Sequence, residues 1–221
     1  IRDREGIVTM RNKGTAVITA TIGKENGWMP TSADYTVTVR FETLNTPVLS
    51  TPGGSSAETA TPIYVSARLT AAAESGVLIY SVDGGESWSG MPANGLQMVN
   101  ADKSPNTVRV MVKAVADGKE DSEVEDGWYV FKYKSASLRL AKTELALQAG
   151  DIVADNKAEA YDIDAQQGEA PQIVYSSSDT SVATVDADGK VTAVNAGEAV
   201  IRAYIKEENG WLESEATCKV T

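Results

Sequence analysis

Few residues of this chain have the types and spacing that catalysis requires. Histidine is absent and Cys218 is the only cysteine, which excludes histidine-based triads, histidine-based zinc sites and intrachain disulfides. Adjacent carboxylates such as Glu120-Asp121 and Glu207-Glu208 stand beside turn residues. Nothing in their sequence surroundings marks a pocket in which they would act as acid and base. We therefore predict that the protein is not an enzyme and has no catalytic residue.

Asp186 and Asp188 are the candidate metal ligands. The run Asp186-Ala-Asp188-Gly189 has the spacing with which a calcium loop begins. The later ligands and the final glutamate of an EF-hand do not follow it. Asp followed by Gly is also typical of a tight turn, and we favour that interpretation. We predict no cofactor, and weak calcium binding at Asp186 and Asp188 is the alternative.

Trp28 and Trp211 are the candidate ligand-binding residues. Each directly follows an Asn-Gly dipeptide, which predicts a loop between two strands of a hairpin. A tryptophan in a loop can stack on a sugar ring or on a protein partner. It can equally cover the end of its own β-sandwich or the neighbouring domain, and we favour that covering role. Burial of both rings is expected in the second case.

A run from Ser81 to Trp88 has a recognisable turn pattern. Its sequence is Ser81-Val-Asp83-Gly-Gly85-Glu-Ser87-Trp88, which resembles the Asp-box of sialidase-like propellers. In that motif the Asp caps a hairpin turn and the Trp packs beneath it. A single copy does not make a propeller, because propeller blades repeat. We therefore predict a structural turn.

A repeated segment positions the two tryptophan loops. Residues 6–22 return as residues 189–205 without a gap, and residues 25–28 return as residues 208–211. Apolar and polar residues alternate in both copies, which predicts strands with one buried face. The apolar positions are Ala16, Ile18, Ala20 and Ile22 in one copy, and Ala199, Ile201, Ala203 and Ile205 in the other. Cys218 aligns with Tyr35 on the next strand, where we expect a half-buried, unreactive thiol.

The second copy has more sequence before it. Tyr175 and a serine-rich turn are followed by Val182-Ala-Thr-Val-Asp186, and then by Gly189–Ala193 and Gly197–Ala203. This pattern resembles the bacterial immunoglobulin-like group 2 family over residues 137–221, with residues 1–40 as a partial copy. The resemblance implies a β-sandwich of the kind used in intimin- and invasin-like adhesins and other surface proteins.

The first copy lacks the front half of that pattern. We expect it to be the back half of a truncated domain, since half a sandwich leaves one apolar face uncovered. The missing strands were cleaved off, were omitted, or are supplied by another chain. The chain opens at Ile1 rather than Met, which we interpret as a processed or trimmed piece.

The middle of the chain predicts another sandwich. Alternating stretches at residues 63–69, 77–82 and 108–116 follow a turn-rich boundary at residues 46–54. Residues 79–85 and 112–122 resemble the small β-sandwich appended to chitobiase-type enzymes, a resemblance that covers residues 46–134. Such appended domains are accessory, so no catalytic residue carries over. Trp128, Tyr129 and Tyr133 are expected in core or inter-domain packing.

The charge and hydrophobicity of the sequence exclude two classes of binding partner. The net charge of −11 repels phosphate backbones, so we predict no nucleic acid. No apolar run approaches the roughly 20 residues that span a bilayer, so we predict no membrane insertion in this segment. Host or cell-surface proteins or glycans, and neighbouring domains of the same polypeptide, are the expected partners.

Together these features predict an all-β chain of tandem immunoglobulin-like β-sandwich domains in an elongated array. The expected domains are residues 1–43, 44–134 and 135–221, joined by short linkers near residues 44–47 and 133–137. The predicted function is a non-catalytic structural or adhesive module, a spacer or cell-adhesion region of a bacterial surface or secreted protein located outside the cell. The alternative is an accessory carbohydrate-binding module of a secreted glycan-degrading system.

Overall fold

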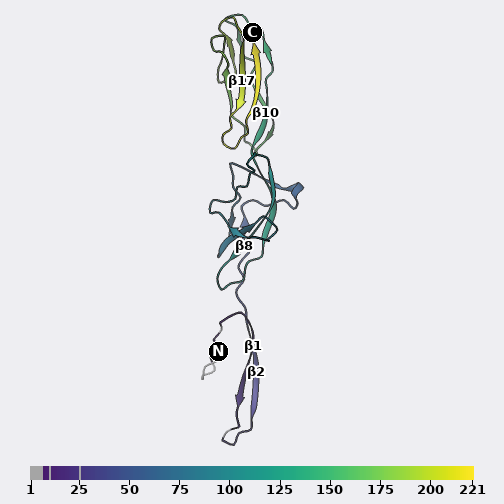
Figure 1. Cartoon of the computed structure of the whole chain (residues 1–221), viewed down its shortest axis with the longest axis vertical. Helices are drawn as coiled ribbons and strands as arrows, with labels where there is room; N and C mark the ends of the chain where they lie inside the picture. The colour runs from purple at the N-terminus through teal and green to yellow at the C-terminus, as the bar shows by residue number, and fades with distance from the viewer. Residues whose placement is uncertain (1–6, 10, 25) are drawn as a thin grey trace.

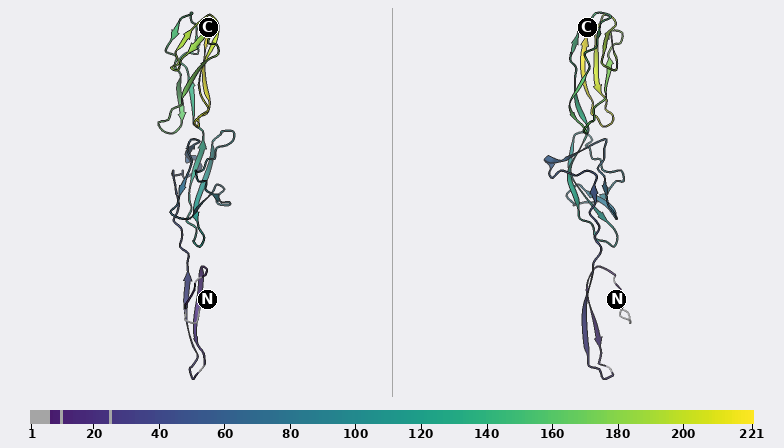
Figure 2. Two further views of the ribbon diagram at one scale, coloured as in Figure 1. Left: turned by 90° about the vertical axis from the view of Figure 1, so that its left-hand side faces the viewer. Right: turned by 180° about the vertical axis from the view of Figure 1, so that it is seen from behind.

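The computed structural model describes residues 7–9, 11–24 and 26–221. The regular secondary structure of these residues consists of strands and one short 3-10 helix, η1 (Ala57–Thr59). Figure 1 shows the strands in three successive groups along one long axis, with the C-terminus at one end and a two-stranded hairpin at the other. The two further views in Figure 2 show the same order. The predicted all-β class and elongated arrangement are therefore confirmed.

The first group, the N-terminal hairpin, consists of β1 (Gly14–Ile22) and β2 (Thr31–Val39). The two strands are antiparallel, with Ile18 opposite Tyr35. Because side chains alternate along a strand, the apolar positions of β1 share one face, as the sequence predicts. Gly6, Met10 and Glu25 of the repeated segment lie outside the described residues.

The middle group contains two sheets, in the orders β3-β5 and β4-β9-β8-β6-β7. Its core includes Leu69, Val110 and Phe131 together with Tyr129, which confirms the core position expected for Tyr129. The strands are β3 (Val48–Leu49), β4 (Thr61–Tyr64), β5 (Ala71–Ala72), β6 (Val77–Ser81), β7 (Ser89–Gly90), β8 (Asn106–Val115) and β9 (Glu125–Lys132).

The strand predicted at residues 63–69 is too long. Strand β4 ends at Tyr64, and the backbone N–H of Ala67 donates to the carbonyl of Tyr64 at 2.8 Å in a turn. The side-chain amide of Gln97 donates to the carbonyl of Ala67 at 3.1 Å. These bonds satisfy backbone groups that a sheet partner would otherwise take, so alternation alone overestimated the strand.

The C-terminal group contains three sheets, in the orders β11-β18-β17-β14, β12-β16-β15 and β10-β13. The predicted inward positions of β17 are all buried, and they are Ala199, Ile201, Ala203 and Ile205. The strands are β10 (Ser135–Arg139), β11 (Glu144–Leu145), β12 (Ile152–Val153), β13 (Glu159–Asp164), β14 (Ile173–Ser177), β15 (Ala183–Val185), β16 (Val191–Ala193), β17 (Ala199–Ile205) and β18 (Ser214–Val220).

Cys218 differs from the prediction. It lies opposite Ile201 and is fully buried rather than half-buried. The prediction was wrong because Cys218 was expected on a strand with one open face, whereas β11 and the second sheet cover it here. Burial raises the pKa of the Cys218 thiol, so the thiolate that would react is disfavoured.

The structure describes no helix that is long and apolar enough to cross a membrane. The domain limits at residues 43/44 and 134/135 stay a prediction, which limited proteolysis would test.

Candidate functional site

The two linkers are paired in the same way with the strand group that follows each of them. Thr43 forms a parallel β-bridge with Glu120, in the loop between β8 and β9. Lys134 forms a parallel β-bridge with Trp211, in the loop between β17 and β18. Each linker therefore docks on the last hairpin loop of the group that it enters. These bridges give hydrogen-bond partners to linker N–H and C=O groups that would otherwise be removed from water without one.

The second of these joints has short backbone hydrogen bonds on both sides of the linker residue. The N–H of Lys134 donates to the carbonyl of Gly210 at 2.8 Å, and the N–H of Leu212 donates to the carbonyl of Lys134 at 2.9 Å. Gly210 has a φ of +81°, a conformation that favours glycine. A Cβ built on Gly210 would stand 2.5 Å from a methyl carbon of Val65. The loop therefore touches the middle group directly.

Trp211 anchors this joint. Its side chain is 7% exposed and packs in a cluster with Ala136, Leu138 and Ile205. The Lys134 ammonium lies 5.7 Å from the ring centroid, a distance at which a cation is attracted to the face of an aromatic ring. Trp211 thus covers the end of its own sandwich and the linker that enters it.

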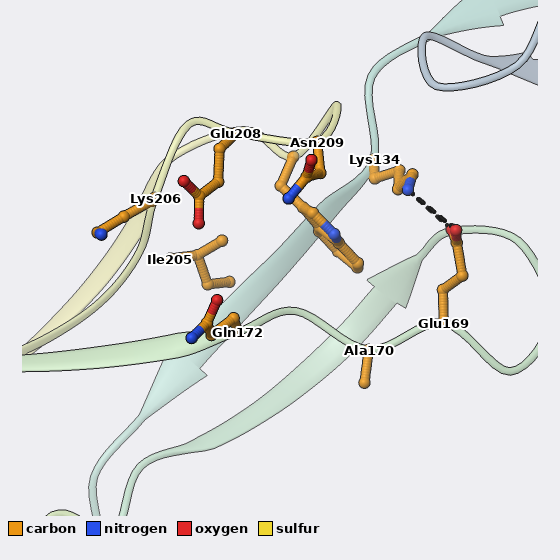
Figure 3. A pocket seen from close by; sticks show the side chains of 9 residues that line it. Lys134, Glu169, Ala170, Gln172, Ile205, Lys206, Glu208 and Asn209 are labelled. Carbon is orange, nitrogen blue, oxygen red and sulfur yellow. Dashed lines mark hydrogen bonds and ion pairs between the residues drawn. The ribbon is translucent and has the colours of Figure 1, made fainter. Parts of the chain in front are cut away.

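Lys134 also forms a partly buried ion pair. Its side chain is 4% exposed and its Nζ lies 3.0 Å from a carboxylate oxygen of Glu169. Figure 3 shows the two side chains pointing toward each other at the edge of a cavity of about 270 Å³. Because the ammonium is nearly desolvated, loss of Glu169 would leave a buried charge without its anion. The cavity lining is mostly polar or charged, with Gln172, Lys206, Glu208 and Asn209 around Ile205.

A second polar contact crosses the same joint. Asp164, at the end of β13, accepts hydrogen bonds from the Tyr64 hydroxyl at 2.7 Å and from Lys132 Nζ at 2.7 and 2.9 Å. Burial opposes the ionisation of Asp164, but the hydrogen bonds from Lys132 and Tyr64 outweigh it and hold its pKa below the usual value. Burial and the hydrogen bond to Asp164 raise the pKa of Tyr64 to about 12. Two strands of the middle group therefore hold a carboxylate of the C-terminal group.

The N-terminal hairpin has the same loop without these partners. Asn26 and Gly27 have φ values of +54° and +82°, against +53° and +81° at Asn209 and Gly210. Trp28 is nevertheless 68% exposed. The structure places the two predicted ligand-binding tryptophans in equivalent loops with opposite exposure. Ligand binding at Trp28 and Trp211 stays a prediction, although the buried ring of Trp211 offers little face to a sugar.

The sequence did not identify Lys134, Glu169, Tyr64 or Asp164 as parts of a site. Their contacts join residues that are far apart in sequence, with residue numbers that differ by 35 for Lys134 and Glu169 and by 100 for Tyr64 and Asp164. The one local signal is the alternation of Lys132 and Lys134 at the linker, which places two cations where the chain enters the next group.

The predicted turn at Ser81–Trp88 is confirmed. The Ser81 hydroxyl donates to Asp83 at 2.7 Å, and the backbone N–H of Ser87 donates to the same carboxylate at 3.0 Å. Hydrogen bonds from Ser81 and Ser87 lower the pKa of Asp83. The Trp88 indole donates to the carbonyl of Gly85 at 3.0 Å and carries Lys113 over its ring at 4.7 Å. The motif is a capped turn, as expected.

Asp186 also caps a turn. One of its carboxylate oxygens accepts from the backbone N–H groups of Asp188 at 3.0 Å and of Lys190 at 2.9 Å. Within the described part of the chain, His, Cys, Asp and Glu side chains form no group of three or more that could hold a metal ion. Calcium binding at Asp186 and Asp188 stays a prediction.

Comparison with protein families gives a match to the C-terminal group. Residues 136–215 match the model of the bacterial Ig-like domain (group 2), which confirms that resemblance for this part of the chain. The match does not extend to residues 1–40 or to the middle group. The partial copy and the chitobiase-type resemblance therefore stay predictions. A search of curated proteins found no match.

The search of solved structures gives low-identity similarities to this chain. Drosophila N-cadherin EC1-4 is 15% identical with a TM-score of 0.32, and the alignment covers 100% of this chain and 61% of that one. Mouse clustered PcdhgC3 EC1-3 is 14% identical with a TM-score of 0.34, covering 99% and 79%. Domains 4 and 5 of the S-layer protein SbsC are 14% identical with a TM-score of 0.35, covering 83% and 98%. Similarity at this level carries no conclusion about function.

Proposed function

We propose that this chain is a non-catalytic spacer segment of a bacterial surface or secreted protein. The observation that carries the proposal is the pairing of each linker with the last hairpin loop of the strand group that follows it. Flexible linkers leave neighbouring domains free to rotate. A linker that is bridged on its backbone and buried at Leu44 or Lys134 restricts that rotation, so the array keeps its length.

The joint around Trp211 supports the proposal most strongly. Backbone bonds at Lys134, ring packing by Trp211 and the contact of Gly210 with Val65 act at one place. Lys103 and Glu207 add an ion pair across the same joint. Exposed ion pairs contribute little individually, so the stiffness rests on the backbone bridge and on packing. A stiff extended array suits a role in holding another domain away from an envelope.

The location outside the cell rests on the family of the C-terminal group. Residues 136–215 match the group 2 immunoglobulin-like family. The resemblance to that family implies a domain of the kind used in adhesins and other surface proteins of bacteria. The acidic chain, with a net charge of −11, disfavours contact with anionic surfaces. We accordingly place the array in the extracellular space, where adhesion to a host or cell-surface protein is the associated role.

Small-angle X-ray scattering tests the spacer function. We expect the 221-residue chain to keep one maximum dimension from low to high salt, because the backbone bridges are not screened as ion pairs are. A variant with four glycine and serine residues inserted between Lys134 and Ser135 should give a shorter mean dimension and a broader distribution. The same insertion between Ala93 and Asn94, in an exposed loop of the middle group, is the control. A wild-type chain as broad in distribution as the linker variant would overturn the proposal.

Glycan binding is the second candidate function. Trp28, 68% exposed in a loop with the exposed Met29 beside it, favours this function over other roles for the loop. Stacking of a sugar on a tryptophan face requires such exposure. A screen of polysaccharides and mucin glycans with the wild-type chain and the Trp28→Ala variant tests it. Binding that disappears in the folded variant would support an accessory carbohydrate-binding module, and absence of binding to every glycan would count against it.

A further inference from the structure

The N-terminal hairpin β1–β2 (the first hairpin) and the hairpin β17–β18 (the second hairpin) have the same register. Ala16 lies opposite Val37 and Ile22 lies opposite Thr31 in β1–β2, while Ala199 lies opposite Val220 and Ile205 lies opposite Ser214 in β17–β18. Every one of these positions is shifted by the same 183 residues, from Ala16 to Ala199 and from Thr31 to Ser214. Each residue that contacts the second hairpin therefore has an equivalent place beside the first hairpin.

The second hairpin is covered on its face and on both edges. Strand β14 pairs with β17, and β11 pairs with β18. One core packs Leu145 and Ala183 against Ile201 and Val220, and another packs Ala136 and Leu138 against Ile205 and Trp211. In both cores the covering residues come from residues 135–185, which precede the hairpin in the chain.

The first hairpin has the same apolar positions but lacks that cover. Ile22 and Tyr35, the counterparts of Ile205 and Cys218, are each 50% exposed. A cavity of about 260 Å³ lies against the hairpin, and its lining includes Val8, Ala16, Ile18 and Val37. The counterparts of these four residues are Val191, Ala199, Ile201 and Val220, which are packed together in one core. The cavity is thus half of a core whose other half is absent from the described residues.

The loop of the first hairpin indicates what is missing beside it. The last hairpin loops of the middle and C-terminal groups are each bridged by the preceding linker, at Thr43 and at Lys134. None of the bridges among the described residues involves the loop of β1 and β2. Trp28 stands where Trp211 is covered by Lys134, Ala136 and Leu138. The same kind of linker would cover Trp28.

We propose that β1, β2 and their loop form an acceptor surface for polypeptide of the same chemistry as residues 134–188. Its linker residue would bridge the backbone at Trp28, and apolar residues at the places of Ala136 and Leu138 would cover Trp28 and Ile22. Apolar residues at the places of Leu145 and Ala183 would fill the cavity over Ile18 and Val37. The proposed source is polypeptide joined to the N-terminal side of Gly6, because residues 134–188 are joined in that way to Gly189 and cover β17–β18.

A second copy of the chain is a poorer occupant. Residues 134–188 donated by another copy would leave that copy's own β17–β18 uncovered, so the exchange creates no net burial. Two N-terminal hairpins packed face to face would cover Ile18 and Val37. They would offer no linker to bridge the backbone beside Trp28. This assignment goes beyond the spacer function and does not depend on the stiffness of the joints.

A spliced chain tests the proposal. Residues 134–188 are joined to Gly6, so that the Asp188–Gly6 junction takes the place of Asp188–Gly189, and the rest of the chain to Thr221 is kept. Hydrogen exchange of β1 and β2 should slow about 100-fold relative to the 221-residue chain, because their amides become part of a cooperative sandwich. Trp28 emission, obtained by difference from the Trp28→Phe variant, should shift to shorter wavelength. The added segment contains no tryptophan.

Control and contrary outcomes separate the alternatives. Leu138→Asp with Leu145→Asp in the added copy alone should abolish the protection and leave β17–β18 unchanged. Where the spliced chain does not fold, residues 134–188 added as a separate peptide to the 221-residue chain give the same readout. Unchanged exchange of β1 and β2 in both arms would overturn the acceptor surface. Protection of the unspliced chain that grows with its concentration would overturn the proposed source in favour of a second copy.

Discussion

Trp28 and Trp211 occupy the same place in two hairpins of matching register, yet Trp28 is 68% exposed and Trp211 is 7% exposed. The loops that carry them have the same backbone conformation. The difference arises from the linker and from β10: the backbone of Lys134 pairs with the loop on both sides of Trp211, and Ala136 and Leu138 pack with its ring. Neighbouring strands, rather than local sequence, therefore decide what each tryptophan does.

The variant Trp211→Ala should destabilise the C-terminal group by about 3 kcal/mol, because the ring packs in a cluster with Ala136, Leu138 and Ile205. The matched variant Trp28→Ala should change the stability of the 221-residue chain by less than about 0.5 kcal/mol, because that ring is exposed. Hydrogen exchange of β17 and β18 measures the first effect, and exchange of β1 and β2 measures the second. Equal losses in the two variants would contradict the difference in burial.

Substitution of Gly210, but not of Gly27, should change the geometry of the joint. Gly210→Ala and Gly27→Ala both place a side chain at a φ near +80°. This strain lowers the free energy of unfolding of each variant by about 1 kcal/mol. Only the Cβ at position 210 meets a neighbour, the methyl carbon of Val65 at 2.5 Å, whereas nothing lies within 4 Å at position 27. We therefore expect Gly210→Ala alone to bend the joint, with a shorter maximum dimension in X-ray scattering. A Gly27→Ala variant that shortens the chain equally would disprove this contact.

The repeat predicted the strand–loop–strand pattern of both hairpins and the buried face of β17, because alternation and the Asn-Gly loop are local signals. The same face of β1 was expected to be buried but is largely exposed, since no strand of the described residues covers it. The Asp-box-like pattern at Ser81–Trp88 predicted the capped turn at Asp83, because that signal is local as well. The environment of Cys218 was misjudged, since β11 reaches its strand from more than 70 residues away, with Leu145 opposite Val220. The Lys134–Glu169 and Tyr64–Asp164 contacts were not predicted, because they depend on how two sandwiches meet.

The Asp164 contact should make the joint sensitive to acid. The pKa of Asp164 is lowered in the folded chain, so its contribution is fully present above the unfolded value of about 3.9. The contribution is lost as the pH falls through the lower folded value. We expect the contact of Lys132 and Tyr64 with Asp164 to weaken below about pH 3.9, with a broader distribution of dimensions in X-ray scattering.

Two variants show whether this acid response belongs to the joint. Asp164→Asn should remove the change in the distribution of dimensions between pH 5 and pH values below about 3.9. Asp83→Asn removes another carboxyl of lowered pKa, but one in a turn of the middle group, and should leave that change intact. A response that persists in Asp164→Asn, or disappears in Asp83→Asn, would assign the acid sensitivity to other groups.

The middle sandwich should depend on a close approach of two backbones at Gly53 and Gly127. A Cβ on Gly127 would lie 2.6 Å from the Cα of Gly53, and the next residues, Gly54 and Trp128, exchange backbone hydrogen bonds of 2.9 Å. Since backbone cannot move aside as a flexible side chain can, Gly127→Ala should cost about 3 kcal/mol. Gly90→Ala is the control, since nothing lies within 4 Å of its added Cβ, and it should change the stability by less than about 0.5 kcal/mol. Hydrogen exchange of β8 and β9 measures both variants, and a Gly127→Ala chain as stable as Gly90→Ala would mean that residues 53–54 do not lie against β9.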